Sequence, residues 1–180
     1  MKFPRCSGVL LHPTSLPGPY GIGDLGDDAY KFADFLADSG QHLWQLLPLA
    51  PTGFGDSPYQ CFSAFAGNPL LISPGRLVEM GLVADAVLQP IPRFPAEKVN
   101  FGRVIEYKKK ILLSAFENFK ETTDTSLRAD FLGFCNKHAS WLDNYSLFRV
   151  LKEENGGAPW DMWPRALSKR DKSALAEAQE

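Results

Sequence analysis

Carboxylates stand in two glycine-rich stretches of this chain, and paired carboxylates serve several hydrolytic and transfer reactions. Asp24 lies within Gly21–Gly26, and Asp56 lies within Pro48–Asn68. A retaining glycosidase-type mechanism needs two carboxyl groups about 5–5.5 Å apart, one as nucleophile and one as acid and base. An aspartate in a glycine-rich loop more often accepts hydrogen bonds from its own backbone and holds a turn. Both interpretations of these two carboxylates stay open at this point.

The stretch Gly21–Gly26 (GIGDLG) matches the G-x-G-x-x-G pattern of dinucleotide-binding proteins. That pattern needs its glycines directly after a strand, and an acidic residue at the end of the next strand. Here the preceding apolar run ends near His12, and the next run ends at Pro48 without a carboxylate. Asp24 would also bring negative charge toward a pyrophosphate. A nucleotide-binding α/β domain is therefore the weakest of the alternatives considered.

The segment Pro48–Asn68 (PLAPTGFGDSPYQCFSAFAGN) combines glycines and prolines with aromatic residues. Glycine and proline at this density exclude a plain helix or a central strand. The aromatic residues argue against disorder, because disordered segments are poor in them. The segment is either an ordered loop that presents rings to a ligand or a surface loop packed on its own rings. The rings concerned are Phe54, Tyr59, Phe62 and Phe65.

Two short apolar runs closed by proline, Ser7–His12 and His42–Leu47, predict strands buried on both faces, as in parallel sheets. Between them the apolar residues Ala29–Leu36 recur at helical spacing, and Gly40 suits a helix C-terminal cap. Strand, helix and strand form a βαβ unit. Both glycine-rich loops follow the carboxyl ends of strands, where α/β proteins bind ligands. We therefore expect the two loops to lie side by side on one rim.

The chain changes character beyond Asn68. A proline-rich connection, Gln89–Pro95, precedes a sequence with helical spacing almost to the end. Val104–Phe119 predicts one helix, Leu127–Phe134 a second that Gly133 weakens, and Trp141–Phe148 a third.

The charge, hydropathy and cysteine content of the chain limit the kinds of partner that we expect it to bind. A formal charge of −2 gives no reason to expect nucleic acid, and the basic cluster Lys108–Lys110 is interpreted as a solvated helix face. No segment has signal-peptide character or the length to span a bilayer, so no membrane partner is expected. Cys6, Cys61 and Cys135 form neither a disulfide framework nor a zinc site, and the histidines lack metal spacing. These features predict a cytoplasmic protein without a metal.

Two long segments resemble the opening of the 4-α-glucanotransferases of the amylomaltase type, also called disproportionating enzymes or the MalQ family. They read GVLLHPTSLPGPYGIGDLG and HLWQLLPLAPTGFGDSPYQCFSAFAGNPLLIS. The later segments FGRVIEYKKKILLSAF, WLDNYSLFRVLKE and PWDMWP are similar to sequences found further along the chain in that family. The resemblance covers nearly the whole chain.

The resemblance implies an α/β fold: the first two strands of a (β/α)8 TIM barrel with a largely helical inserted subdomain. On this basis residues 1–180 form an incomplete catalytic domain. Its parts are a first βαβ unit (1–47), a substrate-binding loop region (48–95) and a helical insertion (96–180). The implied activity transfers α-1,4-glucan segments between maltooligosaccharides or to glucose. The implied route is a retaining double displacement through a covalent β-glucosyl-enzyme, with no metal or organic cofactor.

The resemblance also implies site residues. Tyr59 corresponds to the family tyrosine that lines the donor side of the cleft, and Ser57 and Asp56 are its neighbours in the same loop. Phe54 and Phe101 correspond to aromatics of a second, surface glucan site. Some relatives have tyrosine there, so this chain keeps stacking but not the hydroxyl's hydrogen bond.

The family's nucleophilic aspartate, acid/base glutamate and stabilising aspartate lie on later barrel strands, and no matching segment occurs in this sequence. No catalytic residue is therefore assigned. We expect the chain to be the N-terminal portion of the enzyme, inactive alone, and either prone to aggregate or dependent on a missing C-terminal part. The alternative is a catalytically inactive maltooligosaccharide-binding fragment.

Overall fold

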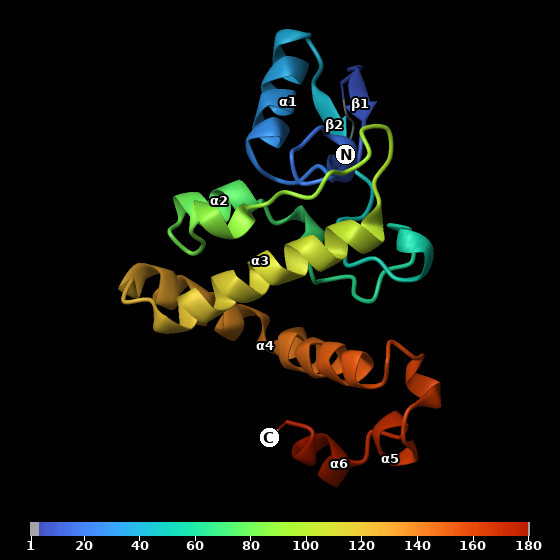
Figure 1. Cartoon of the computed structure of the whole chain (residues 1–180). Helices are drawn as coiled ribbons and strands as arrows, with labels where there is room; N and C mark the ends of the chain where they lie inside the picture. The colour runs from blue at the N-terminus through green and yellow to red at the C-terminus, as the bar shows by residue number, and fades with distance from the viewer. Residues whose placement is uncertain (1–3, 180) are drawn as a thin grey trace. The chain divides into compact units, whose positions relative to one another are not determined.

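The computed structural model describes residues 4–179, and the chain divides into two compact units, the first ending at Thr123 and the second beginning at Asp124. The units are called unit 1 and unit 2, and each is described by itself. Unit 1 contains β1 (Gly8–Leu10), α1 (Asp27–Asp38), β2 (Leu43–Gln45), α2 (Pro74–Glu79), α3 (Phe101–Glu121) and the 3-10 helices η1 (Pro13–Ser15), η2 (Phe54–Asp56), η3 (Pro69–Leu71) and η4 (Asp85–Leu88) (Figure 1). Unit 2 contains α4 (Thr125–Glu154), η5 (Trp160–Met162), α5 (Arg165–Ser168) and α6 (Lys172–Glu177).

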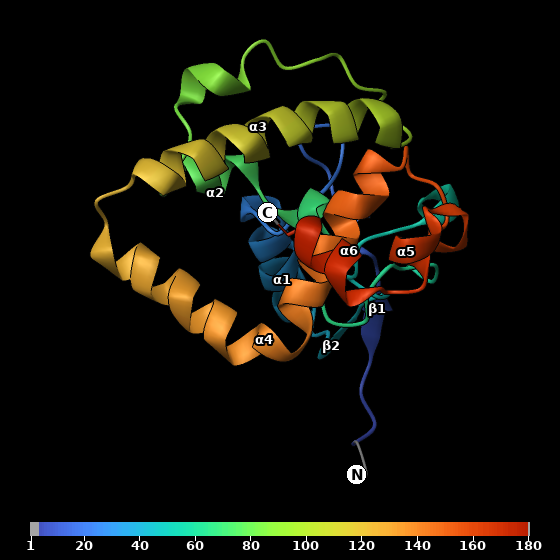
Figure 2. The same cartoon turned by 90° about the horizontal axis from the view of Figure 1, so that it is seen from below.

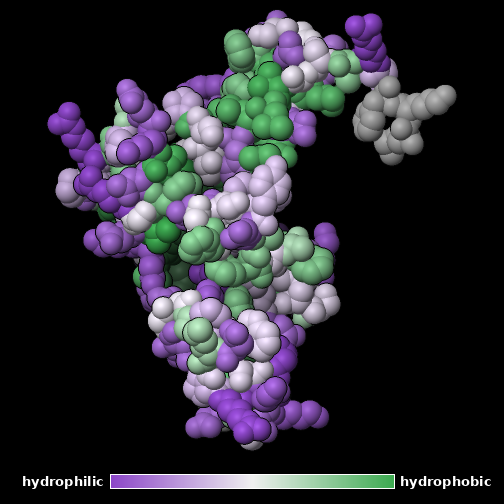
Figure 3. Space-filling model, turned by 90° about the vertical axis from the view of Figure 1, so that its right-hand side faces the viewer, coloured by the Kyte–Doolittle hydropathy of each residue, from purple (hydrophilic) through white to green (hydrophobic). Residues whose placement is uncertain are grey.

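The two strands pair in parallel, with Gly8 opposite Leu43 and Leu10 opposite Gln45. This pairing confirms the expected strand–helix–strand unit. The expected burial of both strand faces was wrong, because Leu10 is 55% and Leu43 is 47% exposed. Figure 3 shows hydrophobic side chains at the surface of this part of unit 1. Apolar strands of this kind are typical of parallel sheets whose two faces are both covered by other elements, and the described residues leave these faces partly exposed.

Helix α1 lies beside the strands in both views (Figures 1 and 2). Its first turn carries Asp27 and Asp28, whose charges favour the positive end of the helix dipole. Its apolar face places Phe32 edge-on against Trp44 of β2, with ring centroids 5.0 Å apart. The indole Nε1 of Trp44 donates to the carbonyl of Leu11 at 2.8 Å, which joins the end of β1 to β2.

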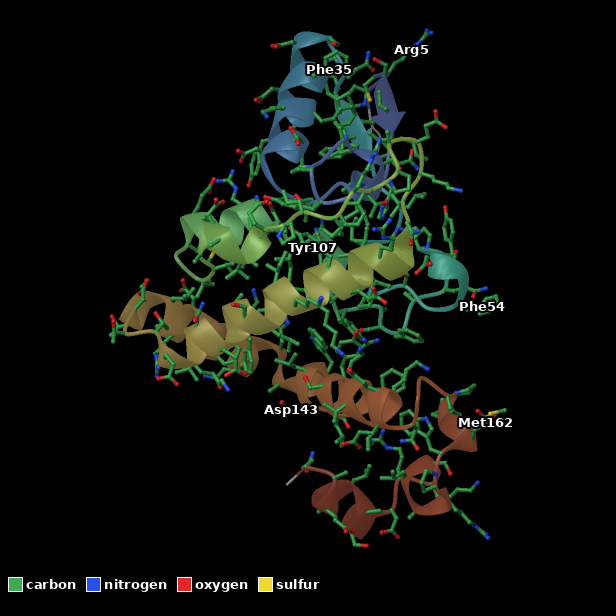
Figure 4. The ribbon with its side chains drawn as sticks, in the orientation of Figure 1. Arg5, Phe35, Phe54, Tyr107, Asp143 and Met162 are labelled. Carbon is green, nitrogen blue, oxygen red and sulfur yellow. The ribbon has the colours of Figure 1, made fainter. Side chains whose placement is uncertain are left out.

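Helix α3 carries the core of unit 1. Asn100 caps its start by accepting from the N–H of Arg103 at 3.2 Å. Tyr107 stacks on Tyr20 with centroids 6.2 Å apart, and its hydroxyl donates to the carbonyl of Leu88 at 2.8 Å. Figure 4 labels this tyrosine on α3. The buried apolar residues around this face are Ile22, Leu70, Val83, Leu88, Val104, Ile111 and Ala115.

Unit 2 is built on one 30-residue helix, α4, where the sequence predicted two shorter ones. Asp124 caps its start through the N–H groups of Ser126 and Leu127. Gly133 does not interrupt the helix. A chain of ring contacts continues along one face with helical spacing, through Phe134, His138, Trp141, Tyr145 and Phe148. Among residues 4–179, none of the helices combines the length and apolar character that a bilayer crossing requires.

Candidate functional site

Residues 49–68 fold back on themselves and are called the ribbon. At its base, the N–H of Asn68 donates to the carbonyl of Leu49 at 2.8 Å. Nearer the tip, Thr52 and Cys61 form an antiparallel bridge, and the N–H of Gly53 donates to the carbonyl of Gln60 at 2.6 Å. The segment is therefore an ordered loop with a defined base and tip, as the sequence predicted.

Most of the aromatic rings of the ribbon face outward. Phe54 is 88%, Tyr59 is 72% and Phe65 is 73% exposed. Figure 4 shows Phe54 pointing away from the rest of unit 1. Phe62 turns inward, and a Cβ atom built on Gly53 would lie 3.3 Å from its ring. Three of the four rings are therefore exposed, and their presentation to a ligand stays a prediction.

The tip of the ribbon brings three predicted site residues into one turn. Gly55 and Asp56 both have left-handed backbone angles, with φ of +68° and +54°. The Oγ of Ser57 accepts from the N–H of Tyr59 at 3.3 Å, which fixes the backbone beneath that ring. Phe54 adjoins this turn in η2.

Phe101 lies elsewhere, as the first residue of α3. Its ring is partly buried and packs against the cluster that contains Ile22, Leu70 and Val104. The sequence assigned Phe101 and Phe54 to a second site, apart from Tyr59, and that pairing stays a prediction.

The two glycine-rich loops meet, as predicted. At their start, Nε2 of His12 lies 3.4 Å from the carbonyl of Pro48, and at their end the N–H of Leu25 donates to the carbonyl of Leu71 at 2.9 Å. The Nδ1 atom of His12 accepts from the N–H and the hydroxyl of Thr14. This network assigns the proton of the neutral ring to Nε2, which donates to Pro48.

His12 gives the first prediction. Burial lowers the pKa of its imidazole below the ordinary value of 6.5, and the hydrogen bond to Pro48 opposes this shift. Between the folded-state pKa and 6.5 the unfolded chain binds more protons, so the free energy of unfolding falls as the pH drops below 6.5. His12→Asn keeps a capping side chain and removes the titration. The free energy of unfolding, measured with urea between pH 7.5 and 5, should fall less steeply with decreasing pH in this variant than in the unmodified chain. Equal slopes in the two proteins would show that His12 does not cause the pH dependence.

Asp24 holds a turn, which confirms the second interpretation of its carboxylate. Its Oδ1 accepts from the N–H of Gly26 at 3.0 Å, and its Oδ2 lies 3.1 Å from Nζ of Lys108. The prediction that Lys108 lies on a solvated face was wrong, because its side chain is 1% exposed. Burial lowers the pKa of this ammonium, and Asp24 opposes the shift. The signal in the sequence was its spacing, four residues after Val104 and three before Ile111.

The glycines of the G-x-G-x-x-G match serve close packing. Gly21 has φ of +76°, and a Cβ atom there would lie 2.3 Å from the ring of Phe94. A Cβ atom on Gly26 would lie 2.4 Å from Oγ of Ser73. Neighbouring side chains thus occupy the space over these two glycines. Within residues 4–179, no three histidine, cysteine or acidic side chains gather as a metal site would require.

A parallel strand–helix–strand unit with its loops beyond the carboxyl ends of the strands places the chain in the class of α/β proteins, which bind ligands at that edge. Residues 11–180 match the family model described as 4-alpha-glucanotransferase, glycoside hydrolase family 77. The chain belongs to this family.

Relatives of this family align along nearly the whole chain. The 4-alpha-glucanotransferase of Thermus thermophilus is 50% identical over 179 residues, which cover 99% of this chain and 35% of that protein. That of Synechocystis is 47% identical over 171 residues, covering 95% of this chain and 34% of the relative. The chain thus spans about a third of the length of these curated relatives.

A solved structure supports the same relationship. An amylomaltase from Streptococcus agalactiae in complex with acarbose matches with a TM-score of 0.91 and 36% identity, over 98% of this chain and 36% of that chain. The likeness shows that the strand–helix–strand unit is the N-terminal portion of a TIM-barrel enzyme. The extent of the helical insertion remains a prediction from the sequence.

Proposed function

We propose that this chain forms the glucan-binding N-terminal part of a 4-α-glucanotransferase. The whole enzyme would transfer α-1,4-glucan segments between maltooligosaccharides, or to glucose, by a retaining double displacement. The catalytic carboxylates would come from the part of the enzyme beyond this chain. The family membership supports the activity, and the acarbose complex of the amylomaltase neighbour supports a maltooligosaccharide-type ligand.

The observation that carries the proposal is the exposure of aromatic rings at the tip of an ordered ribbon. Tyr59 is 72% exposed although Ser57 fixes its backbone. A sugar ring has an apolar C–H face, and a flat aromatic plane buries that face without selecting one pattern of hydroxyls. Asp56 and Ser57 belong to the same turn as Tyr59 and would accept hydrogen bonds from sugar hydroxyls. We assign these three residues to the donor side of the cleft.

We also propose the second glucan site that the family suggests at Phe54 and Phe101. Phe54 is 88% exposed and can stack on a sugar without any rearrangement. Phe101 is partly buried against the cluster that contains Val104, so less of its ring is available. Of the two, Phe54 would supply most of the stacking surface.

The proposal is tested with the monomeric fraction of the chain, isolated by gel filtration. We expect titration calorimetry to detect binding of maltoheptaose, and chromatography after incubation with maltotriose to show no transfer products. Glucose together with longer maltooligosaccharides would place the chemistry inside this chain and contradict the division proposed here. A folded monomer that does not bind maltoheptaose would contradict the glucan-binding role.

Tyr59→Ala is expected to weaken the binding of maltoheptaose about fivefold to thirtyfold, equivalent to about 1–2 kcal/mol, because the stacking plane is lost. Tyr59→Phe should retain most of the affinity. Tyr30→Ala is the matched control, since Tyr30 is 62% exposed on α1, away from the ribbon. Equal effects of Tyr59→Ala and Tyr30→Ala on the dissociation constant would reject the assignment.

Asp56 allows a test in which stability and binding move in opposite directions. A left-handed backbone at φ +54° costs free energy for any residue with a Cβ atom. Asp56→Gly should therefore raise the free energy of unfolding by about 0.5 kcal/mol, after the entropy of glycine is counted. If the carboxylate binds sugar, the same variant should weaken maltoheptaose binding about tenfold, or about 1.4 kcal/mol. Asp56→Asn keeps a side chain that adopts the left-handed backbone and removes only the charge. Unchanged affinity for maltoheptaose in both variants would show that Asp56 is not part of the site.

The alternative function is a binding fragment that has no catalytic partner. Both functions predict affinity for maltooligosaccharides, and transfer activity on addition of the remaining part of the enzyme separates them. Three free cysteines support a reducing compartment, and we propose the cytoplasm.

A further inference from the structure

A buried ammonium lies where three segments of unit 1 meet. The side chain of Lys108 is 1% exposed. Its Nζ atom donates to the carbonyl of Leu70 at 2.7 Å, to the carbonyl of Ile72 at 2.9 Å and to Oδ2 of Asp24 at 3.1 Å. An ammonium has three protons, so each proton of Lys108 has an acceptor.

Two of these acceptors, the carbonyls of Leu70 and Ile72, lie directly beyond the base of the ribbon. The ribbon closes where the N–H of Asn68 meets the carbonyl of Leu49, and the Oδ1 of Asn68 accepts from the N–H of Leu70 at 3.0 Å. The carbonyl of Leu71, between the two that Lys108 holds, accepts from the N–H of Leu25 at 2.9 Å. Three consecutive carbonyls are therefore fixed from outside, two by α3 and one by the loop before α1.

Stability alone gives little reason for a charge at this position. The neighbours of Lys108 on the buried face of α3 are Val104, Tyr107 and Ile111. An apolar residue of similar volume at such a site is often as stabilising as a buried ion pair, or more so, once both partners are replaced. What an apolar residue cannot do is fix the directions of two carbonyls and a carboxylate at once. The three contacts of Lys108 therefore hold the two carbonyls and the carboxylate in fixed positions relative to one another.

We propose that Lys108 is a positioning residue for glucan binding, which ties the base of the ribbon to α3 and to the loop before α1. Through this base it sets where the ring of Tyr59 stands relative to the rest of the rim. The inference rests on the proposed function, because it gives the ribbon its ligand. Lys108 itself touches no sugar.

The test compares Lys108→Met with Lys110→Met, an exposed lysine of the same helix, in the monomeric chain. We expect Lys108→Met to weaken maltoheptaose binding at least fivefold, at a temperature where the variant is folded. Amide hydrogen exchange should accelerate at the N–H groups of Leu25 and Asn68, while the α3 amides stay protected. Lys110→Met should change neither quantity.

The outcomes separate the inference from the function on which it rests. A purely structural role would lower the free energy of unfolding and leave the dissociation constant of the folded fraction unchanged, which would overturn the inference. If Lys108→Met does not fold, Asp24→Asn decides: it keeps both carbonyl contacts, and we expect binding about twofold to threefold weaker, with faster exchange at Leu25. Unchanged affinity in that variant overturns the inference as well. Failure of the unmodified chain to bind maltoheptaose would instead reject the proposed function.

Discussion

Replacing Lys108 by methionine is expected to lower the free energy of unfolding by about 3–5 kcal/mol. The change leaves the carboxylate of Asp24, 11% exposed, without its cation, and leaves the carbonyls of Leu70 and Ile72 without their donor. Unpaired buried polar groups carry their full desolvation cost. Urea denaturation followed by circular dichroism measures the loss.

Two further variants test the reason for this loss. Lys110→Met, on the exposed side of the same helix, should change stability by less than about 0.5 kcal/mol. Adding Asp24→Asn to Lys108→Met removes the stranded charge while an amide oxygen still accepts from Gly26, so the double variant should recover part of the stability. A loss below about 1 kcal/mol in the single variant would show that the pair is not buried in solution.

Gly21→Ala is the second change with a large expected effect, a loss of about 2–5 kcal/mol. One part, about 1–2 kcal/mol, is the cost of φ at +76° for a residue with a Cβ atom. The other part, about 1–3 kcal/mol, is overpacking, because the new atom would lie 2.3 Å from the ring of Phe94. That ring also packs edge-on against Tyr107, with centroids 5.8 Å apart, so its displacement disturbs the core.

Gly81→Ala separates these two costs. Gly81 has φ of +71°, close to that of Gly21, but no atom lies within 4 Å of a Cβ built there. Its loss should equal the backbone cost alone. The difference in lost stability between Gly21→Ala and Gly81→Ala then measures the overpacking of the new atom against Phe94. Phe94→Ala in the Gly21→Ala background should reduce this difference. Equal losses at Gly21 and Gly81 would disprove the packing role of this motif.

The strand–helix–strand unit and its two loops could be predicted from the sequence, because residue types close together in the chain determine them. The proline-closed apolar runs and the acidic start of α1 gave the strand–helix–strand unit, and the meeting of the two loops followed from parallel pairing. Density of glycine, proline and aromatic residues identified the ribbon. The direction of its rings was not predictable, since Phe62 and Phe65 differ in burial although both are phenylalanines of one loop. The ring of Phe62 lies against Gly53 across the ribbon, a packing contact that residue type alone does not reveal.

The failures have physical causes too. Lys108 was assigned to the surface because a lysine triplet usually faces water, and only the distant acceptors Asp24, Leu70 and Ile72 make its burial acceptable. In unit 2, Gly133 weakened the prediction of the second helix, yet it lies inside the continuous helix α4. The cost of one glycine is about 1 kcal/mol, which ring contacts along the same helix face can offset.

Because the base of the ribbon is closed, the residues of its tip can be replaced as one segment. Its ends meet at Leu49 and Asn68, whose carbonyl and N–H groups lie 2.8 Å apart, so whatever residues stand between them start and finish at the same place. Lengthening a flexible connection costs only about 0.6 kcal/mol for each doubling. Tips of different length and ring content can therefore be grafted between Thr52 and Cys61 while the scaffold keeps its register. Libraries confined to these positions would vary the rings of the proposed glucan site while the base of the ribbon stays the same.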